Sequence, residues 1–396
     1  MSSSLDSCME LASSDVKLTP LKDLAEFQRG DSITKKSSEE GEYPVISGGQ
    51  KPAYYINQFN RTGETITVAG SGAYAGFVMY WNKPIFVSDA FSIKVDEQRL
   101  LPRYAYHFLL SMQDKIHALK LGSGVPHVYA KDVAKIPIPT PFPNNRIQSL
   151  AIQAGIVRIL DSFSGLVDKL EAELICRKRQ YEYYLNHLLS FDHDDTSGSV
   201  QWLKLGDIGT FYRGISFQKK HLVESGVPCI HYGQLYTYYG TATDHTKSFI
   251  SENMACNKKL AKTGDLVIAT TSENLEDVGK ATVWLGSEDI LVSNDACFFR
   301  HNQNPKYIAY IFKTNAFFKD KCKYCTGSKV VRISTNSLAN LTVPIPPLAE
   351  QERIVTILDN YSRHYHELKD ELATEITNRR KQYEYYREQL LSFNKL

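Results

Sequence analysis

The chain has 396 residues with a net charge of +2 at pH 7, and 42% of its residues are hydrophobic. This length suits two or three domains rather than one, and we find no apolar run near the roughly 18 residues that a membrane helix needs. Seven scattered cysteines, with only Cys322 and Cys325 closely spaced, indicate neither a zinc site nor a redox centre and favour a reducing cytoplasm.

The first 145 residues divide into a tail and a globular block. Residues 1–15 are Ser-rich and acidic, and we expect a disordered tail rather than a signal peptide. Residues 16–145 read as mixed α/β structure with long loops: strand-like runs lie at 64–68, 76–80 and 91–95, and a short helix is expected at 102–119. The block ends on alternating prolines, Ile136-Pro-Ile-Pro139.

The next segment, 146–195, predicts a long helix. From Ile156 to Leu188, apolar residues follow alternating steps of four and three, and Arg177 is the one interruption. A period of 3.5 residues is typical of helices that pack along a coiled-coil seam. The seam residues include Leu160, Phe163, Val167, Leu170, Leu174 and Tyr181.

Residues 196–347 repeat the first block. Leu21-Lys-Asp-Leu24 and Phe27-Gln-Arg-Gly30 return 184 positions later as Leu205-Gly-Asp-Ile208 and Phe211-Tyr-Arg-Gly214. Further on, Ser88-Asp89-Ala90 is answered by Asn294-Asp295-Ala296, and the exit is again proline-rich, Val343-Pro-Ile-Pro346. Strands are expected at 266–269, 281–284 and 297–300, and a helix at 305–321. So many matches in one order indicate a duplication.

The final segment, 348–396, repeats the long helix. Gln180-Tyr-Glu-Tyr-Tyr184 recurs as Gln382-Tyr-Glu-Tyr-Tyr386, and Arg379 falls where Arg177 fell. Two steps of four in succession from Leu368 make a stutter, which locally unwinds a supercoil. The second seam includes Leu358, Tyr361, Leu368, Leu372 and Tyr383.

These elements predict an architecture of duplicated α/β (mixed α+β) domains separated by two long helices. Roughly 35–40 helical residues make a rod about 50–60 Å long, and two exposed apolar stripes are best buried against each other, antiparallel. The expected molecule is pseudo-twofold, with one domain at each end of a spacer. The alternative is that each helix packs only on its own block.

The two blocks also hold the positive charge. Residues 17–146 carry 16 Lys and Arg against 12 Asp and Glu, and residues 200–349 carry 17 against 12, whereas the two helical segments are slightly acidic. Two basic blocks suit a protein that meets polyphosphate at two places, although a random scatter of charge is an alternative.

The loops between the strands are rich in residue types that read DNA. Basic, amide and hydroxyl side chains pair with base edges and phosphates, and glycines allow a close approach, although the same glycines can be simple turn formers. Equivalent loops differ in sequence on a repeated frame, which predicts two readers of two different half-sites. The candidate DNA-binding residues are Arg29, Lys35, Lys36, Ser47, Gly49, Gln50, Ser71, Tyr74, Ser123 and His127 in the first block, and Arg213, Lys219, Lys220, His231, Tyr232, Gln234, Thr271, Ser272, Ser328, Lys329 and Arg332 in the second.

Catalytic motifs are hard to find in this sequence. It contains no phosphate-binding loop for ATP and no motif of a methyl-transfer centre. Cys229 follows a proline but aligns with Val45, which favours an apolar framework position. Asp89 and Asp295 each stand outside any catalytic motif, and we expect each of them to cap a helix or to form a turn. We therefore predict no catalytic residue and no metal site.

The whole chain resembles the specificity subunit of type I restriction–modification systems. The resemblance is carried by the duplicated Asp-x-x-x-x-x-Arg-Gly opening, the proline exits, the Gln351-Glu-Arg-Ile-Val-Thr-Ile-Leu-Asp359 run and the two Gln-Tyr-Glu-Tyr-Tyr segments. Residues 147–155 depart from the pattern at 349–353, which leaves the docking face of the first helix less defined.

The resemblance implies a non-catalytic chain with two target-recognition domains. Each would read half of a bipartite site in double-stranded DNA, and the helices would set the unread gap and dock two modification subunits. Those methyltransferase subunits would use S-adenosylmethionine, and restriction subunits would use ATP and Mg. The alternatives are a coiled-coil scaffold that binds protein and a stand-alone DNA-modifying enzyme.

Overall fold

The structure is a computed structural model that describes residues 15–191 and 199–393. The expected disordered tail lies almost wholly outside the described residues. The chain divides into two units: unit 1 is Met1–Ala172 with Glu371–Leu396, and unit 2 is Glu173–Asp370. Each unit is described by itself.

The globular part of unit 1 is built on a four-stranded sheet of order β2-β8-β5-β6 and a three-stranded sheet of order β4-β3-β7. A further pair, β1 with β9, joins the start of the domain to its proline-rich exit. The strands are β1 (Val16–Pro20), β2 (Ala25–Arg29), β3 (Tyr43–Ile46), β4 (Tyr55–Ile56), β5 (Glu64–Ala69), β6 (Val78–Asn82), β7 (Phe86–Val87), β8 (Ala90–Val95) and β9 (Pro137–Pro141).

Unit 2 repeats this plan with one extra strand in each main sheet, in the orders β11-β20-β16-β18-β14 and β12-β15-β13-β19. The pair β10 with β22 stands for β1 with β9, and a short pair, β17 with β21, is added. The strands are β10 (Gln201–Lys204), β11 (Gly209–Arg213), β12 (Leu222–Val223), β13 (Val227–Ile230), β14 (Ala242–Thr243), β15 (Ser248–Ile250), β16 (Leu266–Ala269), β17 (Thr271–Ser272), β18 (Ala281–Trp284), β19 (Leu291–Val292), β20 (Ala296–His301), β21 (Val331–Arg332) and β22 (Thr342–Ile345).

The duplication inferred from the sequence is visible in the strand pairing. An equivalent parallel strand pair occurs in each domain: Val45 faces Phe86 in β3–β7, and Cys229 faces Leu291 in β13–β19. Cys229 is buried in this sheet, and burial raises the pKa of its thiol to about 12. It therefore occupies the apolar framework position that its alignment with Val45 predicts.

The short helices differ from expectation in one respect. Each predicted single helix is two helices, α2 (Pro102–Ser111) and α3 (Gln113–Ala118) in unit 1, and α9 (Pro305–Ile311) and α10 (Asn315–Cys322) in unit 2. The breaks have local causes. The Gln113 amide accepts a hydrogen bond from the Val78 N–H and donates to the Gly76 carbonyl, which ties the start of α3 to the sheet edge. The Thr314 hydroxyl caps α10 by accepting from the Phe317 N–H.

The remaining short elements are single turns around the sheets. They are η1 (Leu21–Asp23), η2 (Lys35–Ser37) and α4 (Ala130–Val133) in unit 1, and α6 (Leu205–Ile208), η3 (Lys219–His221), α7 (Gln234–Thr237), α8 (Glu252–Ala255) and α11 (Thr335–Ala339) in unit 2.

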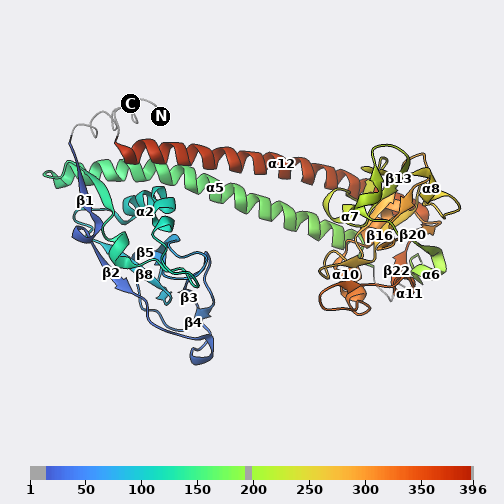
Figure 1. The fold of residues 1–396 in the computed structure, drawn as a ribbon, viewed down its shortest axis with the longest axis horizontal. Coiled ribbons are helices and arrows are strands. Elements are labelled where there is room, and N and C mark those ends of the chain that lie inside the picture. The colour runs from blue at the N-terminus through green and yellow to red at the C-terminus, as the bar shows by residue number, and fades with distance from the viewer. Residues whose placement is uncertain (1–14, 192–198, 394–396) are drawn as a thin grey trace. The chain divides into compact units, whose positions relative to one another are not determined.

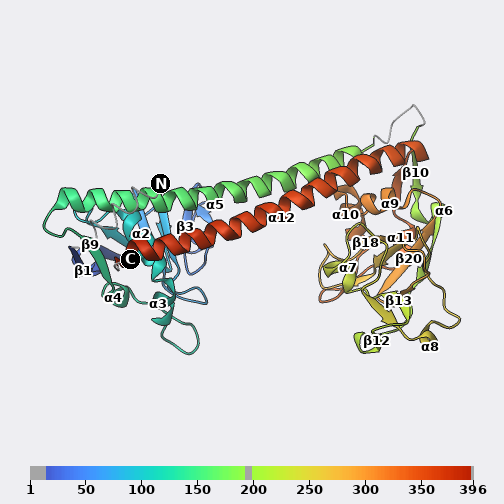
Figure 2. The ribbon, with the colours of Figure 1, turned by 90° about the horizontal axis from the view of Figure 1, so that it is seen from above.

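The two long helices are α5 (Arg146–Leu188) and α12 (Leu348–Ser392), and each unit contains the start of one and the end of the other. In each unit the two segments lie side by side (Figures 1 and 2). The ring of Phe163 stacks on Tyr386 in unit 1, and Tyr181 stacks on Tyr365 in unit 2. Partners with higher numbers on α5 have lower numbers on α12, so the helices are antiparallel.

Both ends of each helix join a domain core. In unit 1, Leu160 of α5 and Leu390 of α12 pack in one cluster with Tyr104 and Phe108. In unit 2, Leu185 of α5 and Leu358 of α12 pack with Tyr307. The alternative in which each helix packs only on its own block is therefore wrong.

The seam residues are buried to different degrees. Leu160, Val167, Leu358 and Leu372 are buried, and Tyr361 is 39% exposed. Arg177 and Arg379, which interrupt the seams, each pair with a glutamate four residues earlier and a glutamine three residues later on their own helix. The half-buried members are Phe163, Leu170, Leu174, Tyr181, Leu368 and Tyr383.

By length and composition alone, one 18-residue window of α5 could cross a membrane. This window is not a continuous apolar run, since the apolar stretch of α5 contains Arg158 and Asp161. The apolar side chains of Ile152, Ile156 and Leu160 are used in the core of unit 1, and Asp161 forms an ion pair with Arg103 there. We therefore assign α5 to the protein core.

Candidate nucleic-acid interface

Loops from one edge of the sheets line a cleft in unit 1. Its volume is about 890 Å³, and it lies where β2 ends, where β7 passes into β8 and where the chain enters α4. Gly30 is required here, because a Cβ on it would collide with the Ser88 carbonyl oxygen. The polar side chains that line the cleft come from Arg29, Asp31, Ser32, Ser88, Asp89, His127, Tyr129 and Lys131.

Three loops meet beside Asp89. The Ser71 hydroxyl donates a hydrogen bond to the Asp89 carboxylate, and Ser71 forms an antiparallel bridge with His127. The Ser47–Gln50 loop is also close, since a Cβ added at Gly48 would lie 2.6 Å from the Ser71 carbonyl oxygen and 3.4 Å from an Asp89 carboxylate oxygen. The fold therefore brings Ser71, His127 and the loop of Ser47 to one place.

Unit 2 has the same arrangement with other side chains. The Thr271 hydroxyl donates to the Asp295 carboxylate at 3.2 Å, and Thr271 is the strand partner of Arg332. His231 comes from the loop equivalent to Ser47–Gln50. Burial lowers the pKa of His231, with the charge of Lys219 acting in the same direction and that of Asp295 opposing it, so these groups are neighbours.

The other candidates of unit 1 surround this cluster or lie away from it. The Tyr74 and Ser123 loops are joined through the Gly72 N–H, which donates to the Pro126 carbonyl, and Tyr74 is 47% exposed. Lys35 and Lys36 are exposed on η2 and do not line the cleft.

In unit 2, three candidates are less accessible than we expected. His231 and Ser272 are each 7% exposed. The Gln234 amide accepts from the His231 N–H and donates to the Ser248 hydroxyl, so it holds its own loop. Tyr232 is half-buried, and the exposed candidates are Arg213, Lys219, Lys220, Ser328, Lys329 and Arg332.

Two further residues, both aspartates, belong to these loop clusters. Asp89 and Asp295 recur at matched positions, but we expected caps or turns because neither had a visible partner. The partners, Ser71 and Thr271, come from another loop, which the spacing along the chain does not reveal. The recurrence of the aspartate was the available signal.

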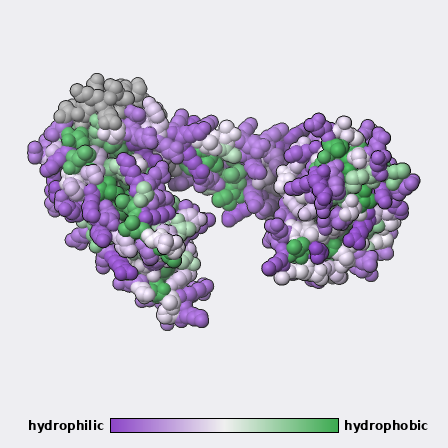
Figure 3. Space-filling view, viewed as in Figure 1, coloured by the Kyte–Doolittle hydropathy of each residue, from purple (hydrophilic) through white to green (hydrophobic). Residues whose placement is uncertain are grey.

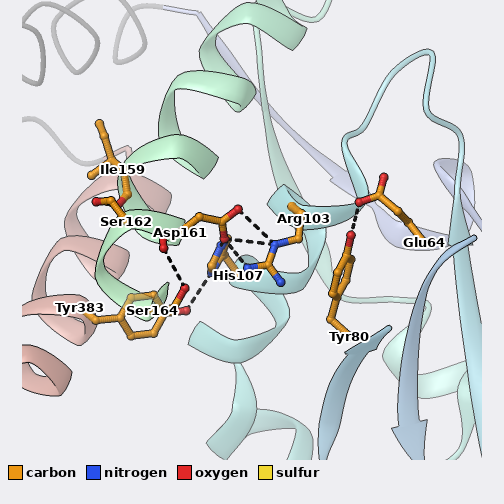
Figure 4. Close-up of polar contacts among 9 residues, drawn as sticks. All are labelled: Glu64, Tyr80, Arg103, His107, Ile159, Asp161, Ser162, Ser164 and Tyr383. Carbon is orange, nitrogen blue, oxygen red and sulfur yellow. Dashed lines mark hydrogen bonds and ion pairs between the residues drawn. The ribbon is translucent and has the colours of Figure 1, made fainter. Parts of the chain in front are cut away.

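A second polar cluster joins the domain of unit 1 to its helices (Figure 4). Asp161 of α5 accepts hydrogen bonds from Arg103 and from Nε2 of His107, the latter at 2.8 Å. The other ring nitrogen, Nδ1 of His107, lies 2.8 Å from the Tyr383 hydroxyl of α12. A neutral imidazole that donates from Nε2 and accepts at Nδ1 satisfies both contacts.

Burial sets the charge states in this cluster. It lowers the pKa of His107, which is fully buried, against the opposing hydrogen bond to Asp161. Burial also works against the charged form of Asp161, but hydrogen bonds from His107 and Arg103 hold the pKa of its carboxyl below the ordinary value. The pair is therefore a neutral histidine beside a charged carboxylate.

We call this polar contact between a domain and the long helices a joint. Unit 2 has an equivalent joint with different donors. Asp359 of α12 accepts from the Lys306 ammonium at 2.6 Å and from the Tyr310 hydroxyl at 2.7 Å. Each long helix is also fixed near its start by a buried glutamine, Gln153 on the Leu101 N–H and Gln351 on the Asn304 N–H. Among the described residues, no group of His, Cys, Asp and Glu side chains is arranged to hold a metal ion.

Comparison with known proteins agrees with this picture of a duplicated chain. Residues 13–175 and 199–378 each match the family described as "Type I restriction modification DNA specificity domain". The chain is 32% identical over 305 residues to the Escherichia coli EcoR124I/EcoR124II type I restriction enzyme specificity subunit, covering 76% of this chain and 73% of that protein. It is 27% identical to a putative type I restriction enzyme specificity subunit of Haemophilus influenzae, over 97% of both chains.

Solved structures share the fold. The S subunit of a type I restriction–modification system from M. genitalium superposes with a TM-score of 0.56 at 18% identity, covering 95% of this chain and 96% of that one. A chain from a study of complex assembly and conformational transition in a type I R-M system gives a TM-score of 0.59 at 16% identity, covering 96% and 98%.

Proposed function

Because this chain belongs to the family of type I restriction modification DNA specificity domains, we propose that it is the DNA-specificity subunit of a type I restriction–modification complex. Each domain, within the predicted limits 16–145 and 196–347, reads one half of a bipartite site in double-stranded DNA. The chain carries no catalytic residue of its own. Methyltransferase subunits supply S-adenosylmethionine chemistry, and restriction subunits supply ATP-dependent cleavage, in the cytoplasm.

One observation carries the proposal: the same loop cluster is built twice with different side chains. Ser71 and His127 in unit 1 stand where Thr271 and Arg332 stand in unit 2. A frame that only stabilised the fold would not need its exposed loops to differ. Side chains that read base edges must differ if the two half-sites differ.

The long helices carry the second part of the proposal, which is that they set the unread gap and dock two modification subunits. Apolar surface is visible along them in Figure 3. Leu166 and Ile175 of α5 and Tyr183 and Tyr385 of the repeated tyrosine segments are exposed by 37% to 62%. Exposed apolar side chains at this density suit contact with partner helices.

The experiment is a selection of bound sequences from random DNA by the chain reconstituted with its modification subunits. We expect two short specific sequences at a fixed separation, with affinity that falls steeply as salt rises. Deleting four residues from one helix, a change of about 6 Å, should shift the gap by roughly two base pairs and leave both half-sites unchanged. Altered half-sites with an unchanged gap would contradict the role of the helices.

Two further measurements, one with the partner subunits and one with the chain alone, separate the alternatives. A protein-binding scaffold would select no DNA sequence even with its partners present. A stand-alone enzyme would modify or cut DNA when the purified chain alone is supplied with cofactors.

A further inference from the structure

Asp89 and Asp295 are the acidic groups that recur in both loop clusters. Asp89 follows β7 and Asp295 follows β19, and each precedes an inner strand of its main sheet, β8 or β20. In both, the main-chain carbonyl accepts from the neighbouring loop, from the Gly70 N–H at 3.1 Å and from the Thr270 N–H at 2.9 Å. The backbone thus fixes the loop, and the side chain is left for another task.

The side chains are placed alike. Each carboxylate accepts one hydroxyl hydrogen bond, from Ser71 or from Thr271. Asp89 is exposed in its cleft and Asp295 is half-buried. An ionised carboxylate offers about four acceptor positions and no donor, so Asp89 retains acceptor capacity toward its cleft and Asp295 retains it beside Thr271.

A carboxylate in a DNA-reading cleft is restricted in what it can face. It repels phosphate oxygens and the acceptor-only major-groove edge of guanine, and in the major groove it can accept only from the amino group of cytosine or adenine. The neighbouring Arg29 and Lys131 give the cleft of unit 1 its compensating positive groups. Asp31 also lines that cleft, but it does not recur in the repeat, where its counterpart is Ile215.

We propose that Asp89 and Asp295 are specificity-determining residues, each of which accepts a hydrogen bond from the exocyclic amino group of a cytosine or adenine in its own half-site. The inference rests on the proposed DNA-reading function. It adds that each half-site contains one base selected by its major-groove amino group, and it names the side chain that selects it.

The experiment measures binding, not methylation, because the modification subunits themselves act on amino groups. Reconstituted complex is titrated with duplexes in which each cytosine or adenine of the half-sites is replaced in turn by an analogue without the exocyclic amino group. For the unmodified protein we expect a loss of affinity on the order of tenfold at one position or more in each half-site.

The variants Asp89→Ala and Asp295→Ala complete a double cycle and serve as controls for each other, since alanine offers no acceptor whereas asparagine still does. Asp89→Ala should bind the natural duplex less tightly and should lose no further affinity at one position of the first half-site, while the second half-site keeps its full dependence. Asp295→Ala should show the reverse. This pattern is not expected if the aspartates only order their loops, because every position of that half-site would then weaken alike.

Several results would overturn the inference. They are no loss at any amino-deleted base with the unmodified protein, a dependence that both variants retain, or a variant that loses all binding. A complex that shows no sequence preference would instead overturn the proposed function, so the two failures are distinct.

Discussion

The two domains share one fold but carry different side chains in their loops. Comparing them separates the residues that the fold requires from those that are free to differ. Tyr104 and Tyr307 are identical and donate to the carbonyls of Pro139 and Pro344 at 2.8 and 2.9 Å. The buried glutamines and the helix aspartates of the joints are identical as well. At the loop cluster, by contrast, a serine and a histidine are exchanged for a threonine and an arginine.

The two joints lie between these extremes, because their acceptor is identical and their donors differ. Asp161 and Asp359 are retained, but their donors change from Arg103 and His107 to Lys306 and Tyr310. What is kept is a charged acceptor on the long helix with one cationic and one neutral donor on the domain. The chemistry of the joint is therefore constrained more tightly than the identity of its residues.

The largest effect is expected from removing that acceptor. Asp161→Ala leaves Arg103 without its ion pair and His107 without an acceptor, and we expect unit 1 to lose about 2 kcal/mol of its free energy of unfolding. Asp359→Ala should do the same to unit 2 alone. Hydrogen-exchange mass spectrometry reports the two units separately. Asp132→Ala, which breaks a surface pair with Lys135, is the matched control and should cost far less.

Equal protection loss in both units after either substitution would contradict independent joints. Such a result would mean that the two units unfold together as one cooperative body.

A smaller effect is expected from pH. Burial holds the pKa of His107 below its ordinary value of 6.5, so the unfolded chain binds the proton first as pH falls. The stability that His107 contributes is present above pH 6.5 and is lost as pH falls toward the folded pKa, by up to about 1.4 kcal/mol per pH unit. His107→Tyr, which installs the residue of unit 2, should flatten this slope in unit 1.

Unit 2 supplies the control for this comparison. Burial lowers the pKa of His301 to about 4, so unit 2 has an acid-sensitive histidine of its own that the substitution does not touch. The pH dependence of exchange in unit 2, corrected for intrinsic rates, should therefore be unchanged in His107→Tyr. An unchanged slope in unit 1 would show that His107 is protonated in the folded protein as readily as in the unfolded one.

The smallest effect concerns two equivalent lysine pairs. Lys35 and Lys36 on η2 and Lys219 and Lys220 on η3 are exposed basic residues at equivalent positions of the repeat. Replacing either pair with alanine should weaken DNA binding uniformly across sequences. It should also reduce the slope of log affinity against log salt by about 1 for each phosphate that the lysines no longer neutralise. A changed base preference would show that the lysines read bases.

The sequence revealed the periodic and repeated features of this molecule. Matched residues such as Arg29 and Arg213 exposed the duplication, and the 3.5-residue period revealed the paired helices, because both signals are local in the chain. It did not reveal the joints, since His107, Asp161 and Tyr383 meet only through packing of three helices. It also missed the break near Met112, where the bond between the Gln113 amide and the sheet overrides helical spacing.

The most direct test of the account exchanges residues 17–145 for those of a relative that recognises another site and then sequences the methylated positions in the genome of the host cell. If the two domains read separately on one frame, the first half-site changes to that of the relative while the second half-site and the gap stay the same. If both half-sites change together, the domains do not read independently and the account is wrong.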